Sequence, residues 1–248
     1  MGGISLNNNK NRSRGEAVEE IEYYILKNKL PAHTKLPSER TMSEMWGFNR
    51  ITLRSAIQRL ILEGKLYNKR GSGTYVANEK IERNLQDLES PTKFISNLGK
   101  SLKNKIISAK IIESNKQTTQ KLHLPLGHKI ALFERIRFIE DEPVMLETSF
   151  LNYNLFTEIE KHNFELESLY EVIEKQYGYK ILKGEQNISI AYATSYEAEL
   201  LHINEGDEVF YVSGTVYNEK EVPMEYFKSI CRADKMRFVS ILKRGKVE

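Results

Sequence analysis

The sequence predicts an α+β protein in which an N-terminal winged helix-turn-helix domain precedes a C-terminal antiparallel sheet domain that carries helices. Helix signals and a hairpin signal follow one another within the first 80 of the 248 residues. Later apolar runs are separated by turn residues, as is typical of antiparallel strands. Charge is also uneven, because residues 1–79 carry a net charge of +5 and residues 80–248 one of −2. A basic segment, as is typical of nucleic-acid-binding domains, therefore precedes a near-neutral segment.

The predicted first domain spans 14–79, after a disordered tail over 1–13 that is rich in Asn, Lys and Gly. Three helical stretches follow, bounded by Gly15 and Pro31, by Ser38 and Gly47, and by Asn49 and Gly64. Their inward positions are Val18, Ile21, Ile25 and Leu26, then Met42, Met45 and Trp46, then Leu53, Ala56, Ile57, Leu60 and Ile61. A short hairpin over 65–76 completes the winged helix-turn-helix.

In this fold the third helix enters the major groove of DNA with its first residues at base edges. Arg50 and Arg54 are four residues apart, so they share one face, and arginine binds guanine or phosphate. The wing tip Arg70-Gly71-Ser72-Gly73 is small enough to enter the minor groove. Two alternatives stay open: the fold also occurs in proteins that bind no DNA, and Arg40 has Glu44 as an ion-pair partner at i+4.

Residues 80–91 read as a polar linker with a helical turn, and 92–248 as the second domain. Its predicted elements are strands over 129–139 and 144–151, a helix over 166–177, a strand over 187–193, a helix from Ser195, and strands over 208–218 and 222–231. Two similar hairpin-plus-helix units suggest a pseudo-repeat.

A cluster of charged residues is predicted on the first hairpin of this domain. Arg135 and Arg137 are two apart on a strand, so they project from the same face. On the return strand Glu147 is two residues from both Met145 and Ser149, so these three side chains project from one face. Two guanidinium groups beside one carboxylate suit an anionic ligand that bears hydroxyl groups, although a cross-strand salt bridge on a solvated face would show the same pattern.

Composition excludes several classes of protein. The single cysteine, Cys231, allows no disulfide framework or multi-cysteine metal site, and in a strand it is expected to be buried and unreactive. No window reaches the roughly 18 apolar residues of a membrane span, and the N-terminus lacks a signal-peptide pattern. The five histidines show no metal-ligand spacing. We expect a cytoplasmic protein with no metal, no cofactor and no membrane partner.

The first domain resembles the DNA-binding domain of the GntR superfamily of bacterial transcription regulators. The motifs that carry this are Leu36-Pro37-Ser38-Glu39-Arg40, Arg50-x-Thr52-x-Arg54, Leu60-x-x-Glu63-Gly64 and Gly71-x-Gly73-Thr74-x-Val76. The resemblance implies DNA contacts by Arg40, Asn49, Arg50, Thr52, Arg54, Arg70, Gly71, Ser72 and Gly73. The family usually has small hydroxyl residues where this chain has Asn49 and Ile51. Ile51 cannot donate a hydrogen bond but suits a thymine methyl group, so the operator is expected to differ from the family's commonest sequence.

The second domain resembles the effector domain (UTRA) of the HutC subfamily, which is similar to chorismate lyase. The matching motifs are Glu134-Arg135-x-Arg137, Pro143-x-x-x-Glu147-x-Ser149, Ser168-Leu169-Tyr170, Pro223-x-Glu225-Tyr226 and Ser229-x-x-Arg232-x-Asp234. Some members bind sugar phosphates or amino-sugar phosphates at these positions. The resemblance implies an effector site made by Arg135, Arg137, Glu147, Ser168, Tyr170 and Glu225, with Ser168 at a helix start and Tyr226 beside the pocket.

These observations predict a homodimeric transcription regulator, most often a repressor in this family, that is not an enzyme. Its partners would be a double-stranded operator with an imperfect palindrome and a small anionic effector. Two alternatives stay open. An enzyme is one, because chorismate lyase shares the second fold; a constitutive DNA-binding protein with a collapsed second domain is the other. A pocket lined by Arg135, Arg137 and Glu147 would discriminate against the constitutive binder.

Overall fold

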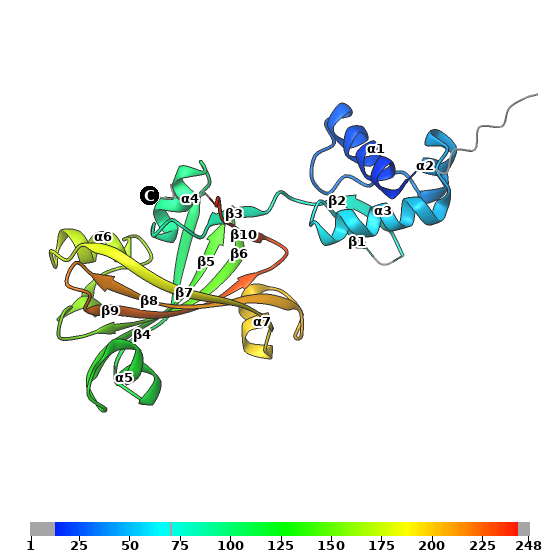
Figure 1. Cartoon of the computed structure of the whole chain (residues 1–248). Coiled ribbons are helices and arrows are strands. Elements are labelled where there is room, and N and C mark those ends of the chain that lie inside the picture. Colours follow the sequence, from blue (N-terminus) through cyan, green and yellow to red (C-terminus); the bar gives the residue numbers. More distant parts are fainter. Residues whose placement is uncertain (1–12, 70, 243–248) are drawn as a thin grey trace, which may run out of the picture. The chain divides into compact units, whose positions relative to one another are not determined.

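The computed structural model of the chain describes residues 13–69 and 71–242, and these form two compact units that meet in sequence at Lys80 and Ile81 (Figure 1). The tail predicted over 1–13 lies outside the described residues except for Ser13. No described helix is both long and apolar enough to cross a bilayer.

The first unit is the predicted winged helix-turn-helix. Its elements are α1 (Arg14–Lys27), α2 (Glu39–Trp46), α3 (Arg50–Leu62), β1 (Leu66–Lys69) and β2 (Gly73–Val76). The side chains of Ser13, Ser38 and Asn49 each accept a backbone N–H of the helix that follows, so all three helices begin at the capping residues that the sequence provides.

The core of the first unit is apolar and follows most of the predicted inward positions. Ile21, Met42 and Leu53 are fully or almost fully buried in it. Two predicted inward residues are wrong: Leu26 is 75% exposed and Met45 is 51% exposed. Leu26 lies in the last turn of α1, where its neighbour Ile25 packs against the core instead.

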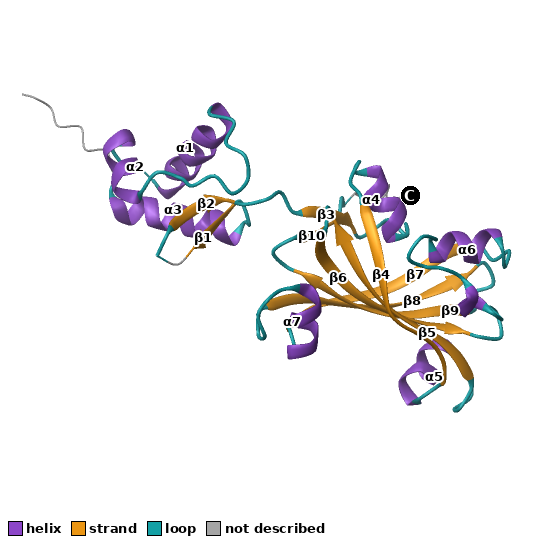
Figure 2. Cartoon of the chain, turned by 180° about the vertical axis from the view of Figure 1, so that it is seen from behind, coloured by secondary structure: helices purple, strands orange, loops and turns teal. Residues whose placement is uncertain are grey.

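The second unit is built on a six-stranded antiparallel sheet of order β4-β5-β6-β9-β8-β7 (Figure 2). Its strands are β4 (Leu102–Glu113), β5 (Lys129–Ile139), β6 (Glu142–Asn152), β7 (Ile181–Tyr192), β8 (Glu208–Asn218) and β9 (Pro223–Arg232). The order strand, helix, hairpin occurs twice, with α5 (Lys116–Leu122) after β4 and α7 (Ser195–Leu201) after β7. This arrangement agrees with the pseudo-repeat that the sequence suggested.

The segment predicted as a linker is partly structured. Residues 81–84 form β3 (Ile81–Asn84), which pairs in parallel with β10 (Met236–Val239). The polar composition of 80–91 conceals this strand because only Ile81 is buried.

Side chains of the sheet alternate between two covered faces. On one face α5 and α7 cover Phe150, Tyr226, Ile136 and Ile230. On the other face lie α6 (Leu169–Lys175), the short 3-10 helix η1 (Ile159–Lys161) and α4 (Pro91–Asn97), which pack on the apolar clusters that include Phe133 and Met145. Between these two clusters the second face carries polar residues, and there a pocket forms.

Candidate functional site

The pocket lies on the sheet face that α4 and α6 cover. Its lining includes every predicted effector residue: Arg135, Arg137, Glu147, Ser168, Tyr170 and Glu225. The unoccupied space is about 570 Å³ with the open mouth included, but water-molecule centres have access to only about 40 Å³. This inner space holds roughly three water molecules, so the pocket is narrow as well as polar.

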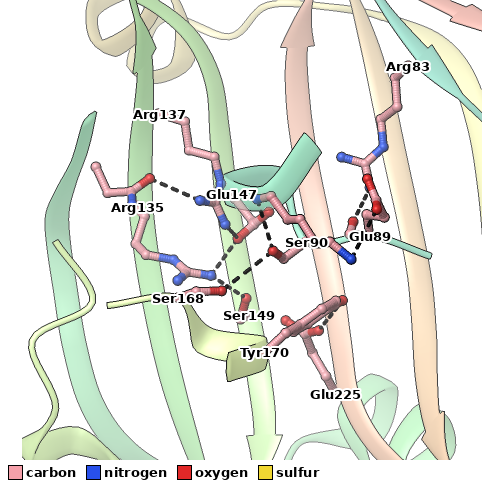
Figure 3. A network of polar contacts seen from close by, with 12 residues as sticks. Arg83, Glu89, Ser90, Arg135, Arg137, Glu147, Ser149, Ser168, Tyr170 and Glu225 are labelled. Atoms are coloured by element: carbon pink, nitrogen blue, oxygen red, sulfur yellow. Dashed lines mark hydrogen bonds and ion pairs between the residues drawn. The ribbon is translucent and has the colours of Figure 1, made fainter. Parts of the chain in front are cut away.

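Strand pairing places the two arginines against one carboxylate (Figure 3). Arg135 on β5 is directly opposite Glu147 on β6, and Arg137 lies one alternation further along the same face. The Nη2 groups of both arginines donate to Oε1 of Glu147 at 2.5 Å. Arg137 also donates to Asn104 and Arg135 to Ser149. The alternative of a solvated surface salt bridge is therefore wrong, because Arg135 is only 1% exposed.

The charges in this cluster are strongly coupled. Burial alone would raise the pKa of Glu147, but the positive charges of Arg137 and Arg135 outweigh it and lower the pKa to about 2. The Nε–H groups of Arg135 and Arg137 are buried and have no hydrogen-bond partner among the described residues. Buried donors without partners are costly, so two unsatisfied guanidinium N–H groups are available to an anionic acceptor.

A second polar pair lines the same pocket. The Tyr170 hydroxyl donates to Oε2 of Glu225 at 3.0 Å. Burial and the nearby Glu147 raise the pKa of Glu225. Ser168 stands at the start of α6, as predicted, but its side chain makes no capping hydrogen bond, and its hydroxyl lies 3.5 Å from that of Ser90. Tyr226 is on the opposite face, where it stacks on Phe150, so its predicted place beside the pocket is wrong.

Sequence reasoning missed three pocket residues in the segment predicted as a linker. Arg83 on β3, Ser90, the N-cap of α4, and Pro91, the first residue of α4, all line the pocket. The Ser-Pro pair at 90–91 was a local signal for a helix start. For Arg83 the only signal was an arginine in a polar stretch.

The lowered pKa of Glu147 gives a testable pH dependence. Since its folded pKa lies below the ordinary 4.5, ionised Glu147 stabilises the fold above pH 4.5, and this contribution is lost as pH falls toward about 2. The shift corresponds to roughly 3 kcal/mol in the free energy of unfolding of the second unit. We expect Glu147→Gln to flatten the decline in stability between pH 5 and 2.5, measured by urea unfolding with circular dichroism.

Two controls sharpen that measurement. Glu185→Gln removes an exposed carboxylate of β7 and should leave the slope unchanged. The only tryptophan, Trp46, lies in the first unit, so its fluorescence reports that unit separately. An identical acid slope in wild type and Glu147→Gln would show that Glu147 does not carry the effect.

A second polar surface lies on the first unit. One depression is lined by residues of α2, the first half of α3 and the wing, including Arg40, Arg50, Arg54, Gly71, Ser72 and Gly73. Gly71 and Gly73 have φ values of +73° and +133°, which suits a tight tip without side chains. Lys35 and Lys69 also line the depression and were missed by the sequence analysis. Arg70 lies outside the described residues.

Several predicted DNA contacts already have partners within the protein. Arg54 donates to both carboxylate oxygens of Glu39, which lowers the pKa of that carboxyl group. Arg40 pairs with Glu44 at 3.0 Å, the alternative that the sequence left open. The Asn49 side chain accepts from the N–H of Thr52 at 2.7 Å, so it acts as a cap. Ile51 is 81% exposed at the start of α3, where contact with a thymine methyl group stays a prediction.

Comparison with known proteins identifies both units. Residues 14–76 match the bacterial regulatory proteins of the gntR family, and residues 97–237 match the UTRA domain. The HTH-type transcriptional repressor NagR of Bacillus subtilis (strain 168) is 30% identical over 229 residues, which cover 92% of this chain and 94% of NagR. A probable fructoselysine utilization operon transcriptional repressor of Escherichia coli (strain K12) is 24% identical, with 83% and 84% of the two chains covered.

Solved structures share the fold. PhnF from Mycobacterium smegmatis has a TM-score of 0.68 at 23% identity and covers 92% of this chain and 100% of its own. The possible transcriptional regulator YydK from Bacillus subtilis has a TM-score of 0.58 at 22% identity, with 93% and 99% covered. Both the sequence families and the architecture agree with the resemblance seen in the motifs. The chain is thus a transcription regulator of the GntR superfamily, of the HutC type, with a UTRA domain after its winged helix-turn-helix domain.

Proposed function

We propose that the protein is a cytoplasmic repressor whose operator affinity falls when a small phosphorylated sugar, with an amino-sugar phosphate favoured, binds in the second unit. The observation that carries this proposal is the buried pair Arg135 and Arg137, which line the pocket and whose Nε–H groups have no hydrogen-bond partner among the described residues. Guanidinium groups bind phosphate and carboxylate through paired N–H donors, and in a buried site each such bond is strong.

The rest of the pocket suits the sugar. Glu225, Tyr170, Ser168 and Ser229 line it and offer donors and acceptors for hydroxyl or amine groups. The unoccupied space of about 570 Å³, with the open mouth included, is of the size of a small-molecule site.

The names of two relatives also support repression and a sugar-derived ligand. The names of NagR and of the fructoselysine utilization repressor describe repressors, and the second is tied to a sugar-derived compound. Repression and a sugar-derived ligand are therefore what we propose for this chain as well.

The two alternatives are less well supported by the geometry. Glu147, held ionised by two arginines with a pKa of about 2, is a poor general base near neutral pH, so the predicted Arg135, Arg137 and Glu147 cluster does not support catalysis with Glu147 as the base. A constitutive DNA-binding protein would have no use for buried, partly unsatisfied arginines in a pocket.

A thermal-shift screen tests the effector class. The panel contains N-acetylglucosamine 6-phosphate, glucosamine 6-phosphate, glucose 6-phosphate, their unphosphorylated sugars and glucuronate. A ligand at 100 times its dissociation constant adds about 2.7 kcal/mol to stability, which is several degrees for a domain of this size. We expect a shift with one phosphate ester and none with its free sugar. No shift with any phosphate ester at millimolar concentration would contradict the proposed class.

We expect a homodimer that is held mainly by the second unit. Regulators with one winged domain per chain gain specificity by pairing two half-sites, and β4 and β7 each have one edge that pairs with no other strand of the described residues. Light scattering coupled to size-exclusion chromatography should give twice the monomer mass at micromolar concentration. A monomer both with and without operator DNA would refute this.

A further inference from the structure

Arg83 is a third arginine on the effector pocket. It comes from β3, while Arg135 and Arg137 come from the sheet. Its side chain is half-buried, with Nη2 3.5 Å from the carbonyl oxygen of Glu89 and the guanidinium 5.8 Å from the centre of the Phe94 ring (Figure 3). Both contacts are weak, and neither neutralises the charge.

The other arginines within residues 81–242 each have a carboxylate partner. Arg135 and Arg137 share Glu147, Arg232 pairs with Asp234 at 2.6 Å, and Arg237 with Glu82 at 3.1 Å. Within residues 81–242, all of which the structure describes, Arg83 is the one arginine for which no ion pair is found. A half-buried cation without a carboxylate at ion-pair distance is stabilised by a ligand that brings a negative charge to it.

The charges of the residues that line the pocket also favour an anionic ligand. Three guanidinium groups line it against two carboxylates, Glu147 and Glu225, so the lining keeps an excess positive charge even with both carboxylates ionised. Arg83 also lines a neighbouring recess between residues 85–89 and β7, so it stands where the two hollows meet. That excess on the pocket lining is one positive charge when both carboxylates are ionised and two when Glu225, whose pKa is raised by burial, is protonated, so the lining attracts an anion such as a phosphate monoester.

We propose that Arg83 contacts the anionic group of the bound effector and so ties the occupancy of the pocket to β3. This inference rests on the proposed effector site and adds a residue outside the HutC-type motifs. The position of Arg83 gives it a second consequence. β3 begins at Ile81, directly after the last residue of the DNA-binding unit. A ligand that displaces Arg83 therefore displaces the strand that follows that unit in the sequence.

The test uses the full-length protein, an operator selected from random DNA, and N-acetylglucosamine 6-phosphate as the probe. The variants are Arg83→Gln, Arg83→Lys and the matched control Arg237→Gln, which removes an arginine from β10, the strand that pairs with β3. We expect Arg83→Gln to weaken probe binding in calorimetry about 10- to 100-fold, the usual worth of a charged hydrogen bond. Arg83→Lys should recover part of the loss, and Arg237→Gln should bind the probe like wild type.

Two further readouts separate a ligand contact from a structural role. At saturating probe, the factor by which the probe weakens operator binding should shrink in Arg83→Gln. Without probe, the unfolding temperature of Arg83→Gln should not fall, because the substitution removes an unpaired charge. Unchanged probe affinity in Arg83→Gln, or an unchanged release factor at saturation, would overturn the inference about Arg83 alone. Failure of wild type to bind any phosphate ester of the panel would instead overturn the proposed function beneath it.

Discussion

Arg135→Ala is expected to abolish the response to the effector while operator binding persists, which gives a repressor that cannot be induced. Arg135 lines the pocket, is almost fully buried and donates to Glu147 and Ser149, and its Nε–H group has no partner among the described residues. Removal of this side chain takes one guanidinium group from the anion site and leaves Arg137 as the ion-pair partner of Glu147. Arg137→Ala should act in the same way if both arginines share the anion. The measurement is operator affinity by fluorescence anisotropy, with and without the sugar phosphate identified by the screen.

Folding has to be checked in these variants, because breaking a buried ion pair typically costs about 3–5 kcal/mol. Arg135→Lys keeps the positive charge but loses the planar guanidinium with its paired N–H donors. It therefore separates the effect of the charge from that of the hydrogen-bond geometry. Trp46 fluorescence shows whether the DNA-binding unit stays intact. If the effector binds Arg135→Ala/Arg137→Ala as tightly as wild type in calorimetry, the effector site lies elsewhere.

Arg50→Ala and Arg54→Ala should each cost roughly 1–3 kcal/mol of specific operator binding, or about 5- to 150-fold in affinity. Arg50 begins α3 and lines the depression beside the wing, where it has no carboxylate partner at ion-pair distance among the described residues. Arg54 is held by Glu39, which fixes the guanidinium on the same surface before DNA binds.

The matched control is Arg59→Ala on the same helix. Arg59 pairs with Glu63 in the last turn of α3, away from the depression, so its loss should change operator affinity little. All affinities need one fixed salt concentration, since phosphate contacts make binding salt-dependent. Wild-type affinity in both Arg50→Ala and Arg54→Ala would show that α3 does not read the operator.

Local signals predicted the first unit well. Caps at Ser38 and Asn49 and the stop at Gly47 are set by neighbours within a few residues, so the helices of the structure begin and end where the sequence indicates. The cluster of Arg135, Arg137 and Glu147 was predictable for a similar reason. Strand alternation fixes which side chains share a face, and a short turn fixes which strands pair.

Long-range pairing concealed the rest. β3 and β10 are separated by most of the second unit, and no local pattern in 80–91 shows that Ile81 will pair beside Met236. The edge strand β4 was also missed, because an edge strand keeps polar residues on exposed positions. Arg83 could not be assigned to the pocket without those pairings. Tyr226 was misplaced because its neighbour Glu225 takes the pocket face, and adjacent strand residues point in opposite directions.

The central claim is that occupancy of the pocket in the second unit controls operator affinity, and reciprocal binding tests it most directly. Operator affinity is measured with and without saturating N-acetylglucosamine 6-phosphate, or the phosphate ester that the screen selects, and the affinity for that ester is measured with and without operator. The account predicts that the ester weakens operator binding about 5- to 150-fold and that operator weakens ester binding by the same factor. Operator affinity that stays the same while calorimetry shows the ester bound in the pocket would contradict it.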